Sequence, residues 1–303
     1  MNELLSSSLS AGSHKIYSRA WAVFRGFYEI FVSSESFSFP LSTATIALFI
    51  SYLRAKQLAA STIRCYISAI SYVHKMKDLH DPTKAFLIQK LLTAAGKNKS
   101  PDSRLPITKP VLIQIVRSLE HTNSSAAQRI LFRAMFLLAF YGFFRVGELA
   151  TKGPDSIRSV IQLKDIRFLK TDGSIRALKI TICHFKHNST NRPVDIVIDN
   201  DCKSPFCPVQ AVLEYCKQRL LEPGPLFQLH NHAVSVHQFN AQLKACLAFC
   251  SLDSTRYKSH SFRIGAACHA AEKGFSDSQI RALGRWKSDA FKLYIRNDTL
   301  AAN

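Results

Sequence analysis

The stretch AMFLLAFYGFF, residues 134–144, is the longest strongly apolar run in the chain, and Arg133 and Arg145 bound it. It is too short to cross the apolar layer of a bilayer, which needs about 20 helical residues. We therefore predict a buried helix, which the pattern of residues 126–144 extends toward the N-terminus. Residues 111–119 carry the same pattern and predict a second helix just before it.

Strand-like segments follow the buried helix. We expect strands within residues 159–168, 177–185 and 194–198, with a Thr-Asp-Gly turn at residues 171–173 and a polar loop over residues 186–193. Beyond Pro208 the apolar pattern is helical to the end of the chain. The fold is thus predicted to be mainly α-helical with a small antiparallel β-sheet, an α+β fold.

The N-terminal residues 1–100 are predicted to form a separate helical domain. Aromatic residues recur there at steps of four and three, the period of an amphipathic helix: Tyr17, Trp21, Phe24, Tyr28 and Phe31. Ser13 can cap this helix. Further helices are expected around residues 46–53, around residues 63–73 after Ser61, and from Asp81 and Pro82 onward.

A boundary is predicted in GKNKSPDSRLPITKP, residues 96–110, because this stretch is rich in Lys, Ser, Gly and Pro and lacks apolar periodicity. We assign residues 101–110 as the interdomain linker. The second domain then covers residues 111–303.

The chain is strongly basic. It has 40 Lys and Arg residues against 21 Asp and Glu, a formal net charge of +19, which predicts an anionic partner such as nucleic acid. The cations are spread along the chain instead of lying beside one amphipathic helix, which argues against a membrane-surface protein. Residues 1–15 carry no secretory signal pattern, so we expect an intracellular protein.

Five cations on the N-terminal helices are predicted to bind DNA, although each taken alone also suits a solvated helix face: Lys15, Arg19, Arg25, Lys56 and Arg64.

The eight cysteines form no CxxC pair, and we expect them to be reduced, structural thiols. Cys202 and Cys207, near His184 and His187, offer an alternative zinc site, but the prolines in the same stretch favour an ordinary turn leading into a helix. The chain has no acidic cluster suited to Mg²⁺ near its motifs and no GxxxxGK[ST] loop. We therefore predict neither a metal nor another cofactor.

Four stretches carry the chemistry: FYGFFRVGEL (140–149), HFKHNSTNRP (184–193), HSFRIGAA (260–267) and LGRWKSDAFKLYIR (283–296). In this order they resemble the catalytic domain of the tyrosine recombinase (phage integrase) family, and the N-terminal helices resemble its core-binding domain. The last stretch is most similar to the enzymes of eukaryotic Crypton and DIRS-type mobile elements. Tyr294 follows Trp286 by eight positions (294 − 286 = 8), where many bacterial members have nine.

This resemblance implies a two-domain clamp on double-stranded DNA that acts as a homotetramer on two DNA sites, and a nuclear location if the chain comes from a eukaryotic mobile element. It implies a site-specific recombinase or integrase that works through a covalent 3′-phosphotyrosine. It also implies six catalytic residues: Arg145, Lys186, His260, Arg263, Trp286 and Tyr294. Glu148 is implied to orient Arg145.

The residue types suit that chemistry. Guanidinium groups bind the non-bridging oxygens of a phosphate bidentately, which suits Arg145 and Arg263. A tyrosine phenol has an ordinary pKa of about 10 and is a poor nucleophile at neutral pH unless neighbouring cations favour the phenolate. Tyr294 would gain that from the arginines.

A leaving 5′-oxygen needs a proton, and a lysine in a β-hairpin loop can supply it. We choose Lys186 as the general acid, with His187 and Lys179 as alternatives. His260 would share in proton transfer or bind a phosphate oxygen. Trp286 would support the site by packing and through its indole N–H.

Other interpretations remain open at this point. In the first alternative, Arg145 only caps the apolar helix and pairs with Glu148. In the second, Tyr294 only packs with Phe291 and Ile295 on a helix face. The whole chain also suits a domesticated DNA-binding protein without activity, or a type IB topoisomerase-like enzyme that relaxes DNA as a monomer.

Overall fold

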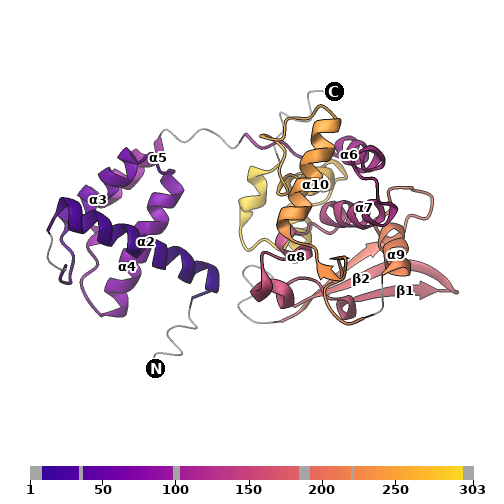
Figure 1. The fold of residues 1–303 in the computed structure, drawn as a ribbon, viewed down its shortest axis with the longest axis horizontal. Helices are drawn as coiled ribbons and strands as arrows, with labels where there is room; N and C mark the ends of the chain where they lie inside the picture. Colours follow the sequence, from indigo (N-terminus) through magenta and orange to yellow (C-terminus); the bar gives the residue numbers. More distant parts are fainter. Residues whose placement is uncertain (1–8, 34–36, 98–102, 184–191, 220–221, 296–303) are drawn as a thin grey trace. The chain divides into compact units, whose positions relative to one another are not determined.

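The computed structural model describes residues 9–33, 37–97, 103–183, 192–219 and 222–295. The chain divides into two compact units, unit 1 (Met1–Asp102) and unit 2 (Ser103–Asn303) (Figure 1). The fold is mainly helical with a small antiparallel sheet, as the sequence predicted. In the described parts of the chain, no helix is long and apolar enough to cross a membrane.

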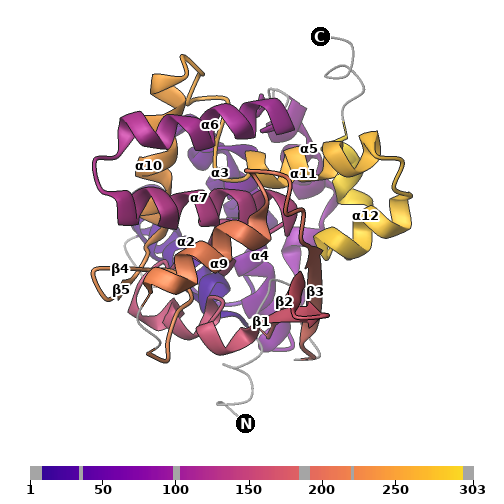
Figure 2. The same cartoon turned by 90° about the vertical axis from the view of Figure 1, so that its right-hand side faces the viewer.

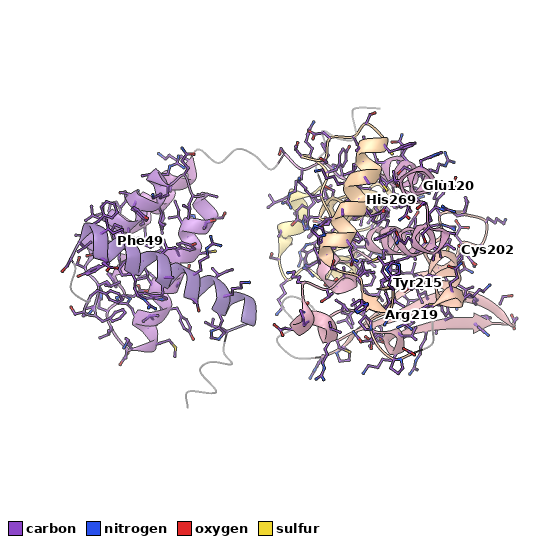
Figure 3. The ribbon with its side chains drawn as sticks, viewed as in Figure 1. Phe49, Glu120, Cys202, Tyr215, Arg219 and His269 are labelled. Carbon is purple, nitrogen blue, oxygen red and sulfur yellow. The ribbon has the colours of Figure 1, made fainter. Side chains whose placement is uncertain are left out.

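Unit 1 consists of helices that enclose an aromatic core. Its elements are α2 (Ala11–Phe31), α3 (Thr43–Ala55), α4 (Ala60–Met76), the 3₁₀ turn η1 (Pro82–Lys84) and α5 (Phe86–Lys97). Phe24 and Phe49 meet edge to face with ring centroids 5.1 Å apart, and Phe49 points into the interior of the unit (Figure 3). Such pairs contribute about 0.5–1.5 kcal/mol each beyond the burial of their area.

Three helix starts in unit 1 differ from the sequence prediction. Helix α2 is capped by Ser10, whose Oγ accepts from the Ser13 N–H at 3.2 Å, so Ser13 lies in the first turn. Helix α4 begins after Ala59 instead of Ser61. Asp81 caps only the short η1, and the main helix starts at Phe86. A chain with several serines at a helix start offers several possible caps, and pattern alone does not choose among them.

Eight of the ten residues of the predicted linker, from Ser103 on, belong to unit 2. The Leu105 N–H donates to the Arg256 carbonyl and the Ile107 N–H to the Ser261 carbonyl, each at 3.0 Å, and the Ile107 side chain is fully buried. The linker assignment of residues 103–108 is therefore wrong. An extended segment rich in Pro and Lys lacks periodicity whether it is a free linker or packed on a domain.

Unit 2 is built around one buried helix. Its helices are α6 (Lys109–Thr122), α7 (Ala126–Tyr141), α8 (Val146–Leu149), α9 (Pro208–Gln218), α10 (Val236–Phe249), α11 (Ser261–Glu272) and α12 (Asp277–Gly284). Helix α7 packs against α6, α9 and α11 (Figure 2). Residues 134–140 of α7 are all buried, which confirms the predicted buried helix.

The sheet of unit 2 has the order β1 (Ile166–Thr171), β2 (Ser174–Ile182) and β3 (Val194–Asp199), all antiparallel. Asp172 and Gly173 form the predicted turn, both with positive φ. Alternate residues of β2 face the core: Leu178, Ile180 and Ile182. The first strand begins later than predicted, because two 3₁₀ turns precede it, η2 (Pro154–Ser159) and η3 (Leu163–Asp165).

The segment beyond Pro208 was predicted to be wholly helical, but it contains a short β-hairpin with a two-residue turn. Strand β4 (Gln228–Leu229) pairs with β5 (His232–Ala233) through His230 and Asn231, which both have positive φ. The turn has no glycine to mark it, so the pattern did not predict it.

Candidate active site

The turn after α7 places Arg145. Gly142 ends the helix, and a Cβ there would lie 2.1 Å from the Phe144 ring, so the turn requires glycine. Phe143 takes a positive φ of 52°, and Arg145 follows as the N-cap of α8. The Glu148 carboxylate accepts from the Arg145 backbone N–H at 2.9 Å and from Arg145 Nη1 at 3.1 Å. The pairing of Arg145 with Glu148 is therefore present.

Helix α11 places Arg263 in its first turn, with His260 as the N-cap. Arg263 is 1% exposed and donates from Nη1 to the Phe143 carbonyl at 2.5 Å and from Nη2 to the Gly284 carbonyl. Gly265 lets α11 approach closely, because a Cβ there would lie 1.8 Å from the Ile107 carbonyl oxygen. The extended segment before α6 thus helps to fix the helix that carries Arg263.

Trp286 covers the Arg263 guanidinium. The Arg263 Cζ lies 4.2 Å from the ring centroid, a cation–π contact. The indole also meets the rings of Phe143 and Phe291 at 6.1 and 5.7 Å. The packing role predicted for Trp286 is present in the structure.

Tyr294 ends the 3₁₀ turn η4 (Asp289–Leu293), and its half-buried ring lies 5.2 Å from the His260 ring and 6.0 Å from the Trp286 ring. Fully buried Phe291 anchors this segment, and Cys268 Sγ donates to the Tyr294 carbonyl at 3.2 Å. Tyr294 packs in the cluster that contains Phe291, as the alternative interpretation predicted, and it also faces His260. The two interpretations are compatible.

The structure brings together most of the residues predicted for the site, all within unit 2: Arg145, Glu148, His260, Arg263, Trp286 and Tyr294. Lys186 and His187 lie outside the described residues. Lys179, the other candidate acid, lies on β2 and pairs with Asp195 at 2.7 Å. The catalytic roles themselves stay predictions.

Arg285 is a member of this site that sequence reasoning missed. It follows α12 in the left-handed conformation (φ 55°, ψ 44°) and is 8% exposed. Its Nη2 donates to Glu148 Oε2 at 2.8 Å and to the Phe143 carbonyl at 3.3 Å. A signal was present, since Arg285 precedes Tyr294 by nine positions (294 − 285 = 9), the spacing noted for many bacterial members.

We call Arg145, Arg263 and Arg285 with the single carboxylate of Glu148 the arginine cluster. Burial, together with the nearby charges of Arg145 and Arg285, lowers the pKa of Arg263 to about 9, and the opposing effects of Glu148 and Tyr294 do not offset this. Burial also lowers the pKa of Arg285. Three guanidinium groups around one carboxylate leave a surplus of positive charge in a poorly solvated place, which an anion would neutralise.

The described residues contain no group of three or more His, Cys, Asp or Glu side chains arranged to hold a metal ion. Cys202 is exposed, whereas Cys207 is buried at the start of α9 and donates from Sγ to Asn200 Oδ1 at 3.3 Å. The histidines weighed with them in the zinc alternative, His184 and His187, lie outside the described residues.

The unit 1 cations predicted to bind DNA are all exposed: Lys15, Arg19, Arg25, Lys56 and Arg64. The first three lie on α2, with Lys15 and Arg19 one turn apart. Lys56 follows α3 and lies 5.7 Å from the Tyr52 ring centroid. Arg64 on α4 donates to the Leu92 carbonyl at 2.9 Å and so also links α4 to α5.

Comparison with known proteins gives similarity in structure alone. No family model and no curated protein matches the sequence. A lambda integrase dimer bound to a COC′ core site matches 98% of this chain and 75% of its own at 16% identity, with a TM-score of 0.64. XerH site-specific recombinase bound to palindromic difH, a post-cleavage complex, matches 94% and 77% at 15% identity, with a TM-score of 0.66.

The Tn1549 transposon integrase, in complex with circular intermediate DNA, matches 95% of this chain and 90% of its own at 12% identity, with a TM-score of 0.64. These matches span both units. The fold is therefore that of the tyrosine recombinases and integrases.

Proposed function

We propose that this chain is a site-specific DNA recombinase or integrase that breaks and rejoins DNA strands through Tyr294. One observation carries the proposal: the Tyr294 ring lies beside His260 and beside Trp286, and Trp286 covers buried Arg263 of the arginine cluster, which has surplus positive charge. A backbone phosphate is the anion that such a cluster suits, and a tyrosine beside it is in position to attack. The fold and the net charge of +19 support double-stranded DNA as the partner.

In the proposed reaction, Arg145 and Arg263 bind the non-bridging oxygens of the scissile phosphate. Tyr294 Oη attacks the phosphorus, its proton passing to a neighbouring base such as His260, and the bond to the 5′-oxygen breaks. That oxygen takes a proton from the general acid, and a 3′-phosphotyrosine remains. A 5′-hydroxyl of another strand then attacks this ester and releases Tyr294, so the bond energy is conserved and no cofactor is required.

Further parts of the proposal concern biology. We propose a homotetramer on two DNA sites, with both units contacting the duplex, and an origin in a Crypton or DIRS-type mobile element with a nuclear location. The support is the GRWKSDAFKLYIR motif of residues 284–296 and the likeness to the Tn1549 transposon integrase.

The test is a pool of duplexes with randomised sequence around one 5′-bridging phosphorothiolate, incubated with the full chain. The thiol leaving group does not religate efficiently, so cleavage traps the protein on DNA. We expect SDS-stable adducts that Tyr294→Phe does not form, and sequencing of the trapped DNA identifies the target. Adducts that persist in Tyr294→Phe would disprove the role of Tyr294.

Two other outcomes would overturn the proposal. DNA retention without any adduct would identify a DNA-binding protein without activity. Relaxation of supercoiled plasmid by a monomer, with no strand exchange between two trapped sites, would identify a type IB topoisomerase-like enzyme.

Lys186 can be tested with the same site once it is known. We expect Lys186→Ala to slow cleavage of an ordinary phosphodiester by about 10²–10⁴-fold, the usual contribution of a general acid. The phosphorothiolate should restore most of this loss, because a thiolate leaves without a proton. An equal loss on both substrates would assign the proton donor elsewhere.

A further inference from the structure

The turn at residues 284–286 supplies three different groups to the arginine cluster. The Gly284 carbonyl accepts from Arg263, the Arg285 side chain binds Glu148, and the Trp286 ring covers Arg263. A Cβ on Gly284 would lie 1.6 Å from the Trp286 ring, so the turn also requires glycine. Of the three groups, only Arg285 adds a charge, and the proposed reaction leaves that charge unused.

Arg285 contacts the acceptors that hold both phosphate-binding arginines. Glu148 Oε2 accepts from Arg285 Nη2 and from the Arg145 backbone N–H, while Oε1 accepts from Arg145 Nη1. The Phe143 carbonyl accepts from Arg263 Nη1 and from Arg285 Nη2. Arg285 is therefore the link between the Arg145 side and the Arg263 side of the cluster.

The Arg285 side chain is itself too enclosed to bind a ligand. It is 3% exposed, and its Nη1 donates to the Gly142 and Leu283 carbonyls at 3.3 and 3.4 Å. Its Cζ lies 5.1 Å from the Phe144 ring centroid. Any effect of Arg285 on a bound phosphate must pass through its neighbours.

We propose that Arg285 is a positioning residue that fixes Arg145 and Arg263 in one geometry for a phosphate group without touching it. The inference rests on the proposed function, which makes a DNA phosphate the ligand. Arg285 and Arg145 share the single negative charge of Glu148. Glu148 therefore orients Arg145 without cancelling its positive charge. A planar guanidinium fork can reach Glu148 and three backbone carbonyls at once, which a lysine cannot do.

The backbone conformation of Arg285 also suggests that its side chain has a specific role. A non-glycine residue in the left-handed region costs about 1–2 kcal/mol, and Arg285 stands there between Gly284 and Trp286. Arg285→Gly removes that cost together with the side chain. It therefore separates the backbone requirement of the turn from the contacts of the guanidinium.

The experiment measures phosphate binding in the full chain by the fluorescence of Trp286. The chain has two tryptophans, and Trp21→Phe leaves Trp286 as the only one. Because Trp286 lies on Arg263, inorganic phosphate bound to the arginines should change its emission, at ionic strength matched with chloride. We expect Arg285→Met and Arg285→Gly to weaken phosphate binding by about tenfold or more, and Arg285→Lys to recover part of it.

Arg219 provides a matched control. It is an arginine of unit 2, also 8% exposed, that donates to the Glu222 and Pro225 carbonyls and lies near Tyr215 (Figure 3). Arg219→Met should bind phosphate within about twofold of the parent, whatever it does to the melting temperature. The double variant Arg285→Met with Glu148→Gln removes both charges of the buried Arg285–Glu148 pair and leaves neither of these two partners unpaired. It should therefore fold, yet still bind phosphate weakly.

The outcomes separate this inference from the proposed function. Parent-like binding by Arg285→Met and Arg285→Gly, or an equal loss in Arg219→Met, would overturn the positioning role alone. A parent that binds phosphate but forms no DNA adduct would overturn the proposed reaction and leave the positioning role standing. A parent that gives no phosphate response would contradict both.

Discussion

Positive charge is arranged differently in the two units of this chain. The unit 1 cations are exposed on α2, on α4 and just after α3, whereas the arginine cluster of unit 2 is joined through Glu148 and the Phe143 carbonyl. Exposed charges act on a polyanion nearly independently and are screened by salt. The arginines of the cluster share hydrogen-bond acceptors, so we expect the loss of one member to disturb the positions of the others. The comparison separates affinity for DNA from chemistry on DNA, and the predictions that follow test that separation.

The largest effect should come from Arg263. Arg263→Met should lower the rate of adduct formation by about 10²–10³-fold, the loss typical of removing one preorganised donor from a transition state. DNA affinity should change little, because the chain has 40 Lys and Arg residues that could bind the phosphate backbone. Single-turnover cleavage and filter binding on the trapped site measure the two quantities. A loss confined to affinity would show that Arg263 is an ordinary DNA contact.

An effect mainly on stability, and less on the cleavage rate, should follow Glu148→Gln. The amide cannot offset the charges of Arg145 and Arg285, and breaking a buried ion pair costs about 3–5 kcal/mol. Thermal unfolding should show unit 2 melting at a lower temperature. Added phosphate should recover part of the loss, because the anion replaces the missing negative charge. No recovery with phosphate would argue against an anion site at the cluster.

An effect on affinity alone is expected from Arg19→Ala. The slope of log K against log salt should fall by about one for a random-sequence duplex, as for the loss of one phosphate contact. Lys90, an exposed cation on α5 outside the predicted set, is the control. Equal slopes for Arg19→Ala and Lys90→Ala would remove Arg19 from the DNA surface.

The smallest effect concerns Asp81 in unit 1. Burial acts to raise the pKa of its carboxyl, but hydrogen bonds from Ser71 and Thr83 outweigh burial and hold the pKa below its ordinary value. Asp81 therefore adds stability above the ordinary pKa of 3.8, and that stability is lost as pH falls through the lower folded value.

Asp81→Asn keeps a capping oxygen but weakens the charge-assisted hydrogen bonds from Ser71 and Thr83, and should cost about 1 kcal/mol at neutral pH. The difference from the parent should shrink on acidification below pH 3.8, as measured by urea unfolding of the full chain. A difference independent of pH would mean that the carboxylate charge is not the stabilising feature.

The sequence predicted those parts of the fold that depend on local pattern. Helix α7 was predicted because an apolar run of this length between two arginines indicates a buried helix. The Asp172–Gly173 turn was predicted because its positive φ angles favour Asp and Gly. The segment through Ile107 was missed because its order comes from contacts with Ser261 and Gly265, which are distant in sequence.

The candidate site divides in the same way. Arg145, Arg263 and Tyr294 stand in motifs that chemistry and resemblance both single out. The nine-position step from Arg285 to Tyr294 was the one signal for this residue. Its left-handed conformation has no local signature, and its partner Glu148 lies elsewhere in the chain. Pairing across such distances is decided by the tertiary fold alone.

The buried Ile107 has a practical consequence for anyone who divides the chain. A fragment cut at residue 111, where the sequence pattern resumes, would lack the strip that lies against Gly265 and hydrogen-bonds to Ser261. In that fragment, the surface of α11 at Gly265, which the backbone of Ile107 covers in the full chain, would be exposed to solvent. A fragment that begins at residue 103 keeps that strip, and is the better starting point for expression, crystallisation or isotope labelling of unit 2 by itself.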